Sequence, residues 1–340
     1  MPKSPPFSRA VRIALLLLPA SFFLLACNGR KQSGQEAVAA EVPLVKTPVF
    51  NADSAYAFVE KQVDFGPRVP NTRGHGQCSD YLINQFKRYG AEVTVQAFVA
   101  NAFDGSRLQS RNIIAAINPA AGKRIMLAAH WDTRPFADQD SVRKNQPIGG
   151  ADDGGSGVAV LLEIARVIGA DSLRPKVGVD FILFDSEDYG APEGQEGKDA
   201  SKQWYCLGSQ HWAANKHRPN YSAYFGILLD MVGAKNGRFA REGTSVEYAN
   251  GVVTNVWNLA SRLGYSQYFI PAASGSIMDD HVFVNQVAKI PTIDIVGYNQ
   301  AGPNYFGSHW HTHQDNLSIV DRGTLKAVGQ TVLQAVYQEN

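Results

Sequence analysis

Residues 125–132 read Ile-Met-Leu-Ala-Ala-His-Trp-Asp, an apolar run that gives way at once to polar and aromatic side chains. Five consecutive apolar residues predict a strand that is buried on both faces. The run at 177–184 has the same form, because it is followed directly by Asp-Ser-Glu-Asp. Buried strands that end in polar groups are typical of a sheet whose carboxyl edge carries a site.

The rest of the chain extends this pattern. Further apolar runs at 112–117, 224–229 and 291–296 also predict strands. Between the runs lie segments with apolar residues three and four apart, which predict helices at 79–89, 157–168, 207–217, 252–263 and 324–337. This alternation predicts an α/β fold, a three-layer sandwich with a central mixed, mostly parallel sheet flanked by helices.

The first 26 residues resemble a bacterial lipoprotein signal peptide. A basic start precedes an apolar run over 11–25, and Leu-Leu-Ala stands directly before Cys27. That run is shorter than the ~20 residues that a membrane-spanning helix needs. We therefore expect residues 1–26 to be removed and Cys27 to carry the lipid, with 27–48 as a flexible tether and 49–340 as a single catalytic domain. The domain would then lie in the periplasm, lipid-anchored to the cell envelope.

Charge and cysteine content narrow the choice of partners. The chain has 32 Lys and Arg against 31 Asp and Glu, and no run of one sign. Without a basic stretch, we expect no nucleic-acid partner. Cys78 and Cys206 are the remaining cysteines, and the sequence leaves open whether they form a disulfide or stay as buried thiols.

Acidic and imidazole side chains gather at the predicted strand ends and in nearby loops. Each alone has an ordinary explanation, since Asp commonly caps helices and forms turns. Together they would crowd carboxylates at one rim, which raises pKa values and costs stability unless a divalent cation binds there. Carboxylates and imidazoles without thiolates fit a catalytic zinc. The neighbours Glu187 and Asp188 further suggest that one carboxylate binds the metal while the other moves protons.

A serine hydrolase is the rival that Gly155, Ser156 and Gly157 suggest. The Gly-x-Ser-x-Gly pattern fails, because the fifth position is Val158. Ser156 also lies inside a glycine-rich turn and not directly after a strand. The sequence therefore favours metal chemistry.

Six motifs, in this order, resemble the zinc aminopeptidase superfamily that includes the animal-type glutaminyl cyclases. They are His130-x-Asp132, Gly-Ala-Asp-Asp153-x-x-Ser-Gly, Phe-Asp-x-Glu187-Asp188, Leu-Asp230-Met, Asp280-His281 and Trp310-His311-Thr. Within the superfamily, the segment at 68–75, the strand at 111–119, the insertion that reaches Trp204, and Trp310 directly before His311 are similar to the cyclases.

The resemblance implies a role for each matching residue. One zinc would be held by Asp153, Asp188 and His311, with Glu187 as the acid/base. Catalysis would also use Asp230 and Asp280, and the substrate pocket would be walled by Trp204 and Trp310. Asp188 departs from the family pattern, in which glutamate is usual, so its metal coordination is left open.

Aminopeptidases and cyclases of the superfamily differ at two of these positions. In the aminopeptidases His130 and Asp230 would bind a second zinc. In the cyclases the counterparts are turned away, and that of Asp230 shares a hydrogen bond with that of Asp280.

The implied activity is conversion of the N-terminal glutamine of peptides or proteins to pyroglutamate with release of ammonia. This glutaminyl-peptide cyclotransferase would use one Zn²⁺ per chain and act as a monomer. A zinc aminopeptidase with two Zn²⁺ is the first alternative. A non-catalytic envelope lipoprotein is the second.

Overall fold

The computed structural model describes residues 42–192, 195, 202–302 and 305–339. The predicted signal peptide, Cys27 and the tether up to residue 41 lie outside the described residues. A compact unit runs from Leu44 to Asn340 and contains the predicted catalytic domain. Val45 and Thr47 form hydrogen bonds with side chains of the C-terminal helix α7 (Arg322–Gln338).

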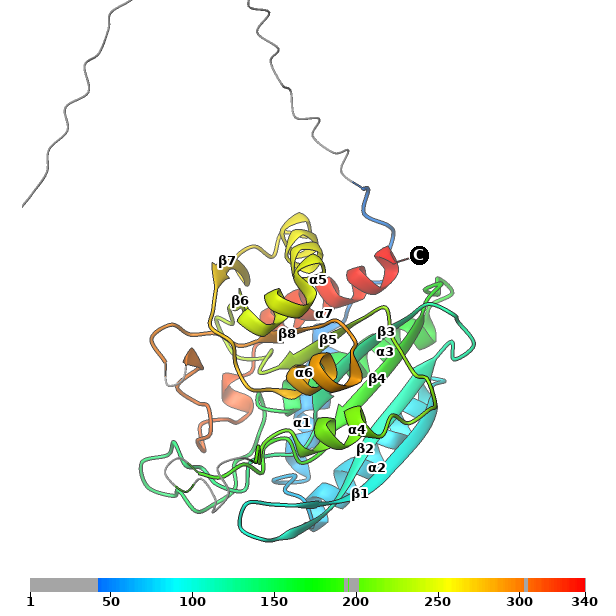
Figure 1. The fold of residues 1–340 in the computed structure, drawn as a ribbon. Coiled ribbons are helices and arrows are strands. Elements are labelled where there is room, and N and C mark those ends of the chain that lie inside the picture. The colour runs from blue at the N-terminus through cyan, green and yellow to red at the C-terminus, as the bar shows by residue number, and fades with distance from the viewer. Residues whose placement is uncertain (1–41, 193–194, 196–201, 303–304, 340) are drawn as a thin grey trace, which may run out of the picture. The chain divides into compact units, whose positions relative to one another are not determined.

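A six-stranded sheet forms the centre of this unit, in the order β1-β2-β4-β3-β5-β8 (Figure 1). Its strands β4, β3, β5 and β8 are parallel, β2 pairs antiparallel with β4, and the edge strand β1 pairs antiparallel with β2. This confirms the predicted mixed, mostly parallel sheet. The strand bounds are β1 Glu92–Asn101, β2 Arg107–Ile117, β3 Arg124–His130, β4 Gly178–Phe184, β5 Phe225–Asp230 and β8 Thr292–Val296.

Helices cover both faces of the sheet and confirm the three-layer sandwich. Alternate strand residues explain the two cores: Leu127 and Phe181 pack on one face, and Met126 and Ile182 pack on the other. The first face is covered by α7 and by α1 (Ala52–Asp64), α2 (Arg73–Arg88), α3 (Gly155–Ala170) and α5 (Gly243–Arg262). The second is covered by α4 (Leu207–Ala214), α6 (Asp280–Phe283) and the π-helix η1 (Val284–Ala288).

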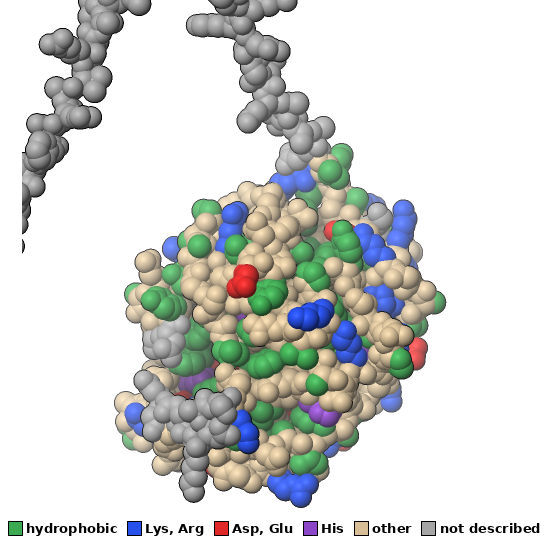
Figure 2. All heavy atoms as spheres, in the orientation of Figure 1, with side chains coloured by type: hydrophobic (Ala, Val, Ile, Leu, Met, Phe, Trp, Pro, Cys, Tyr) green, Lys and Arg blue, Asp and Glu red, His purple; other side chains and the backbone are tan. Residues whose placement is uncertain are grey.

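Smaller elements complete the described structure. A two-stranded parallel ribbon is formed by β6 (Phe239–Arg241) and β7 (Phe269–Ala273), and a 3-10 turn, η3, spans Leu317–Ile319. On the face drawn in Figure 2, Lys and Arg side chains are scattered among apolar and uncharged surface. Among the described residues, no helix combines the length and apolar character that a bilayer crossing requires.

All five predicted strands and all five predicted helices are present, with different bounds. The largest difference is α5, which begins at Gly243 and not at residue 252. Its N-terminal part is separated from the rest by a kink at Ala249, whose φ is −143° and ψ is 37°. The elements α1, β1, α6, η1, η3 and the β6–β7 ribbon were not predicted.

Candidate metal centre and active site

The carboxyl edge of the parallel strands carries the polar groups. His130 is the last residue of β3 and Asp230 the last of β5, while Glu187 and Asp188 lie three and four residues after the end of β4. His311 lies in the loop that follows β8. Because parallel strands end at a common edge, residues far apart in the chain meet there.

Asp153, Asp188 and His311 lie close enough to hold one metal ion. Their ligand atoms are all within 4.8 Å of one another, and all three side chains are buried. The Nε2 atom of His311 lies 3.2 Å from Asp188 Oδ1 and 3.8 Å from Asp153 Oδ2. The structure thus brings together the three residues for which zinc binding was predicted.

Asp132 positions the segment that carries Glu187 and Asp188. Its two carboxylate oxygens accept the backbone N–H groups of Glu187, at 3.0 Å, and Asp188, at 3.2 Å. Ser186, just before them, has a φ of 57°, so the chain turns sharply as it leaves β4. Asp132 therefore ties the end of β3 to the end of β4, a role that its motif alone did not indicate.

A second buried carboxylate, Asp315, positions Asp153. It accepts the N–H groups of Asp152, at 2.7 Å, and Asp153, at 3.1 Å. The next residue, Gly154, has a φ of 78°, and a Cβ atom there would lie 2.7 Å from the carbonyl oxygen of Asp132. Only glycine fits this close approach, which presses the turn before α3 against the end of β3.

The imidazole of His311 is held from its other nitrogen. Its Nδ1 lies 3.2 Å from Asp138 Oδ1, and Asp138 in turn accepts two hydrogen bonds from Arg134, at 2.8 and 2.7 Å. A carboxylate on the far nitrogen is the usual partner of a metal-binding histidine, because it fixes the ring orientation. Asp138 and Asp315 were not predicted as part of the site.

The electrostatics of the group fit a divalent cation. Burial, reinforced by the charge of Asp153, raises the pKa of Asp188, whose Oδ2 atom is buried without a hydrogen-bond partner. Burial raises the pKa of Glu187 well above its usual value, and Asp188 and Asp279 add to the effect. A cation would compensate this crowded negative charge and occupy the orphaned oxygen. Two carboxylates with one imidazole are a donor set that zinc accepts.

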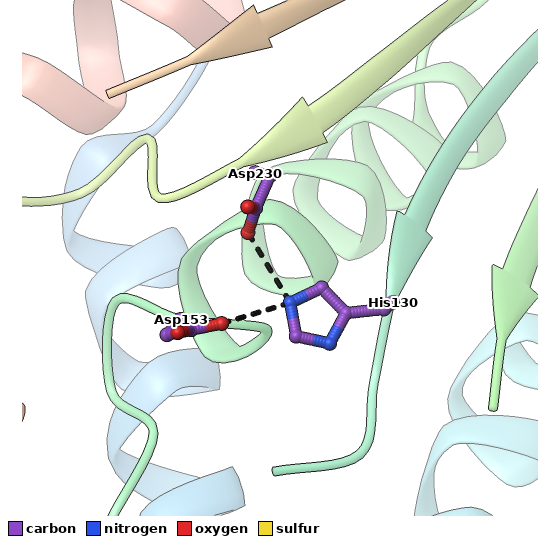
Figure 3. Close-up of side chains that lie close together, drawn as sticks. All are labelled: His130, Asp153 and Asp230. Atoms are coloured by element: carbon purple, nitrogen blue, oxygen red, sulfur yellow. Dashed lines mark hydrogen bonds and ion pairs between the residues drawn. The ribbon is translucent and has the colours of Figure 1, made fainter. Parts of the chain in front are cut away.

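His130, Asp153 and Asp230 form a second group, drawn in Figure 3. The Nε2 atom of His130 lies 3.0 Å from Asp153 Oδ1 and 3.2 Å from Asp230 Oδ1. Burial disfavours the imidazolium, but the nearby carboxylates of Asp132, Asp153 and Asp230 prevail and raise the His130 pKa well above its usual value. The side chain of His130 therefore lies between two buried carboxylates, those of Asp153 and Asp230.

This arrangement differs from the one that the cyclase resemblance implied. There, the counterpart of His130 is turned away and the counterparts of Asp230 and Asp280 share a hydrogen bond. Here His130 faces the site, and both carboxylate oxygens of the buried Asp280 lack a hydrogen-bond partner. Asp230 pairs with His130 instead, because the imidazole offers a positive partner that a second carboxylate does not.

Glu187 contacts a thiol and an acid outside the metal group. Cys206 donates a hydrogen bond from Sγ to Glu187 Oε1 at 3.1 Å, and an oxygen of Asp279 lies within 4.8 Å of the ligand atoms of both. Asp280 follows as the first residue of α6, close enough to raise the Glu187 pKa. Cys206 and Cys78 are both free, which answers the open question about a disulfide.

The two predicted pocket tryptophans are both half-buried. Trp310 stacks on the ring of His311, with centroids 3.8 Å apart, so it lies directly beside the metal group. Trp204 lies near the ammonium of Lys202, 5.6 Å from its ring centroid. Part of the insertion that carries Trp204, residues 193–194 and 196–201, lies outside the described structure.

A mostly parallel sheet with a buried carboxylate and imidazole group at its carboxyl edge defines a metal-dependent α/β enzyme. The chain belongs to peptidase family M28, whose family model matches residues 112–336. This confirms the resemblance to the zinc aminopeptidase superfamily.

Two solved structures are similar over almost their whole length. The glutaminyl cyclase of Tannerella forsythia is 50% identical with a TM-score of 0.83, covering 86% of this chain and 100% of that one. A Zn-dependent exopeptidase from Parabacteroides distasonis is 51% identical with a TM-score of 0.83, covering 86% and 99%. The glutaminyl-peptide cyclotransferase of Drosophila melanogaster is 27% identical over 281 residues, 76% of this chain and 73% of its own.

Proposed function

We propose that this protein is a glutaminyl cyclase, which converts the N-terminal glutamine of peptides or proteins to pyroglutamate and releases ammonia. The observation that carries the proposal is the carboxyl of Glu187, which adjoins Asp188 in the chain but is not a member of the Asp153–Asp188–His311 group. The 50% identity with the Tannerella forsythia glutaminyl cyclase, across all of that chain, supports this activity over others built on the same fold.

Asp153, Asp188 and His311 would hold one zinc ion in this proposal. Their burial, their mutual distances and the orphaned oxygen of Asp188 support a bound cation. Membership of family M28 and the likeness to a Zn-dependent exopeptidase support zinc as its identity. When bound, zinc supplies Lewis-acid polarisation of the substrate carbonyl.

Glu187 moves the proton in the proposed reaction. Its carboxylate takes a proton from the substrate's α-amine, and the amine nitrogen then bonds to the γ-carbonyl carbon and closes a five-membered lactam. The bond from that carbon to the amide nitrogen breaks, and Glu187 returns the proton to this nitrogen, which leaves as ammonia. The raised pKa of Glu187 suits a group that must both accept and return a proton near neutral pH.

Neighbouring side chains orient the substrate. Asp230 and Asp280 would accept hydrogen bonds from the leaving amide nitrogen, and Trp204 and Trp310 would wall the pocket. Because the attacking and attacked groups belong to one residue, holding the glutamine in a folded conformation is the main task of these side chains.

An aminopeptidase is the second candidate, favoured by one observation. The Nε2 atom of His130 lies 3.0 Å from Asp153 Oδ1 and 3.2 Å from Asp230 Oδ1, and ligand atoms of the three residues are close enough to one another to hold a second zinc. Glu187 would then draw a proton from water, which would attack the first peptide bond. Two zinc ions per chain would accompany this activity, against one for the cyclase.

A mass measurement decides between these candidates. Incubation with a peptide that begins with glutamine should produce a species lighter by one ammonia if the protein is a cyclase. Loss of a whole residue would establish the aminopeptidase, and an unchanged mass would favour a non-catalytic lipoprotein. Glu187→Gln is the control: it should retain zinc and lose turnover, since its amide cannot accept the proton.

We also propose that the protein is a monomer, lipid-anchored in the periplasm through Cys27. The sequence before Cys27 supports the lipid anchor, and the predicted tether, residues 27–48, would link Cys27 to the catalytic domain. Metabolic labelling with a fatty acid should mark the wild-type chain in bacterial membranes. Equal labelling of Cys27→Ser would contradict the anchor.

A further inference from the structure

Cys206 is the hydrogen-bond donor that the structure gives to the Glu187 carboxyl. The distance from Sγ to Oε1 is 3.1 Å, and the Cys206 side chain is completely buried. Nineteen positions separate the two residues in the chain, so the contact is made by the fold and not by local sequence.

The backbone on both sides holds this contact in place. Cys206 donates its N–H to the carbonyl oxygen of Glu187 at 2.8 Å, and Leu207 donates to that of Ser186 at 3.1 Å. Cys206 also has a φ of 60°, a left-handed conformation that a residue with a side chain adopts at a cost. These hydrogen bonds hold Cys206 in its strained conformation, and this conformation places its side chain beside the Glu187 carboxyl.

The surroundings keep the sulfur a donor. Burial, and then the charges of Glu187, Asp280 and Asp279, raise the pKa of Cys206 well above its usual value, so the group remains a protonated thiol. A thiol donates one weak hydrogen bond. It can therefore orient a carboxyl without binding its negative charge as tightly as a lysine or arginine would.

We propose that Cys206 is a positioning residue for the acid/base: its thiol holds Oε1 of Glu187 and leaves Oε2 to exchange the proton with substrate. The inference rests on the proposed function, in which Glu187 moves that proton. A carboxyl fixed in one orientation transfers protons faster than one that samples several, because proton transfer requires a short and well-aligned contact.

The test compares substitutions of two buried free cysteines in the zinc-loaded protein. Cys206→Ala removes the hydrogen-bond donor, and Cys206→Ser restores one. Cys78→Ala is the control: it removes a thiol that is also buried but lies on α2 in the hydrophobic core, with Leu82 and Phe86. Turnover of a Gln-initiated peptide is measured with zinc content and melting temperature. If Cys206→Ala does not fold, Cys206→Gly replaces it, since glycine adopts a φ of 60° without strain.

We expect Cys206→Ala to lower kcat by roughly tenfold, part of the 10²–10⁴ that acid/base catalysis contributes in general. KM should change less than about twofold, because the thiol binds Glu187 and not the substrate. Cys206→Ser should recover most of kcat, and Cys78→Ala should keep the wild-type kcat per zinc-loaded molecule.

Other outcomes separate this inference from the proposed function. A wild-type kcat in Cys206→Ala or Cys206→Gly overturns the role of Cys206. So does a loss of kcat in Cys78→Ala as large as that in Cys206→Ala. A kcat of Cys206→Ser no higher than that of Cys206→Ala overturns it as well. Glu187→Gln distinguishes failure of the proposed function from failure of the inference about Cys206. If this variant retains most turnover, the assignment of Glu187 as the acid/base fails. If it is inactive while Cys206→Ala is normal, only the inference about Cys206 fails.

Discussion

At the scale of single residues, the carboxylates of this protein differ through their hydrogen-bond donors. The carboxylate oxygens of Asp132 and Asp315 accept hydrogen bonds from backbone N–H groups, so these two residues hold the backbone in place. Among the described residues, Glu187 accepts a side-chain hydrogen bond from the Cys206 thiol, which is a weak donor. Glu242 lies at the other extreme, since it accepts from the N–H groups of Thr244, Ser245 and Ile277, from the Ser245 hydroxyl and from the His281 ring.

The charge of Glu242 should make a measurable, pH-dependent contribution to stability. Burial opposes that charge, but the hydrogen bonds from His281 and Ser245 prevail and lower the Glu242 pKa from 4.5 to about 2. A depressed acid stabilises the native state above its unfolded pKa, and this stabilisation is lost as the pH falls toward the folded pKa. The shift corresponds to about 3 kcal/mol.

Glu242→Gln should therefore lower the free energy of unfolding by a few kcal/mol at pH 7, with the difference from wild type shrinking between pH 4.5 and 2. Denaturant unfolding at several pH values measures this. Glu247→Gln is the matched control, because Glu247 is exposed on α5, the helix for which Glu242 is the N-cap residue; it should stay within about 0.5 kcal/mol of wild type. A Glu242→Gln deficit that is constant with pH would show that the charge is not its source.

At the scale of elements, burial decided which ones the sequence could predict. The strands β3 and β4 are buried at every position, so an apolar run identified them. The edge strand β1 pairs on one side only and, of its residues, Ala100 alone is buried. Its first apolar residues alternate with Glu92, Thr94 and Gln96, so its sequence does not form the kind of apolar run that identifies a strand buried on both faces. Helix α1 buries only Ala55, Val59 and Gln62, and so few buried positions form an apolar stripe too weak to predict a helix. Its N-cap, Asn51, is nevertheless recognisable in the sequence.

At the scale of the whole molecule, metal binding and folding should be linked. The proposed ligands Asp153, Asp188 and His311 come from the turn before α3, the loop after β4 and the loop after β8, so one ion would join three distant segments. An ion that binds only the native state stabilises it, by about 4 kcal/mol when its free concentration is a thousandfold above Kd.

Removal of zinc with a chelator should accordingly lower the melting temperature by several degrees and abolish turnover, and added zinc should restore both. Differential scanning calorimetry and metal analysis provide the measurement. His311→Ala, which lacks one of the three proposed zinc-binding side chains, should melt at the same temperature with and without chelator. Equal melting of the chelated and zinc-loaded wild type would exclude the linked site.

The sequence by itself determined the α/β class, the mixed sheet and the set of acids and imidazoles at its edge. It could do so because burial and strand periodicity follow from the pattern of neighbouring residues in the chain. Only the tertiary structure decided that His130 faces Asp153 and Asp230, that Asp132, Asp138 and Asp315 orient the ligands, and that Cys206 reaches Glu187. These contacts depend on rotamers and turn conformations, which are set by packing between segments distant in the chain. Residue type alone does not specify them.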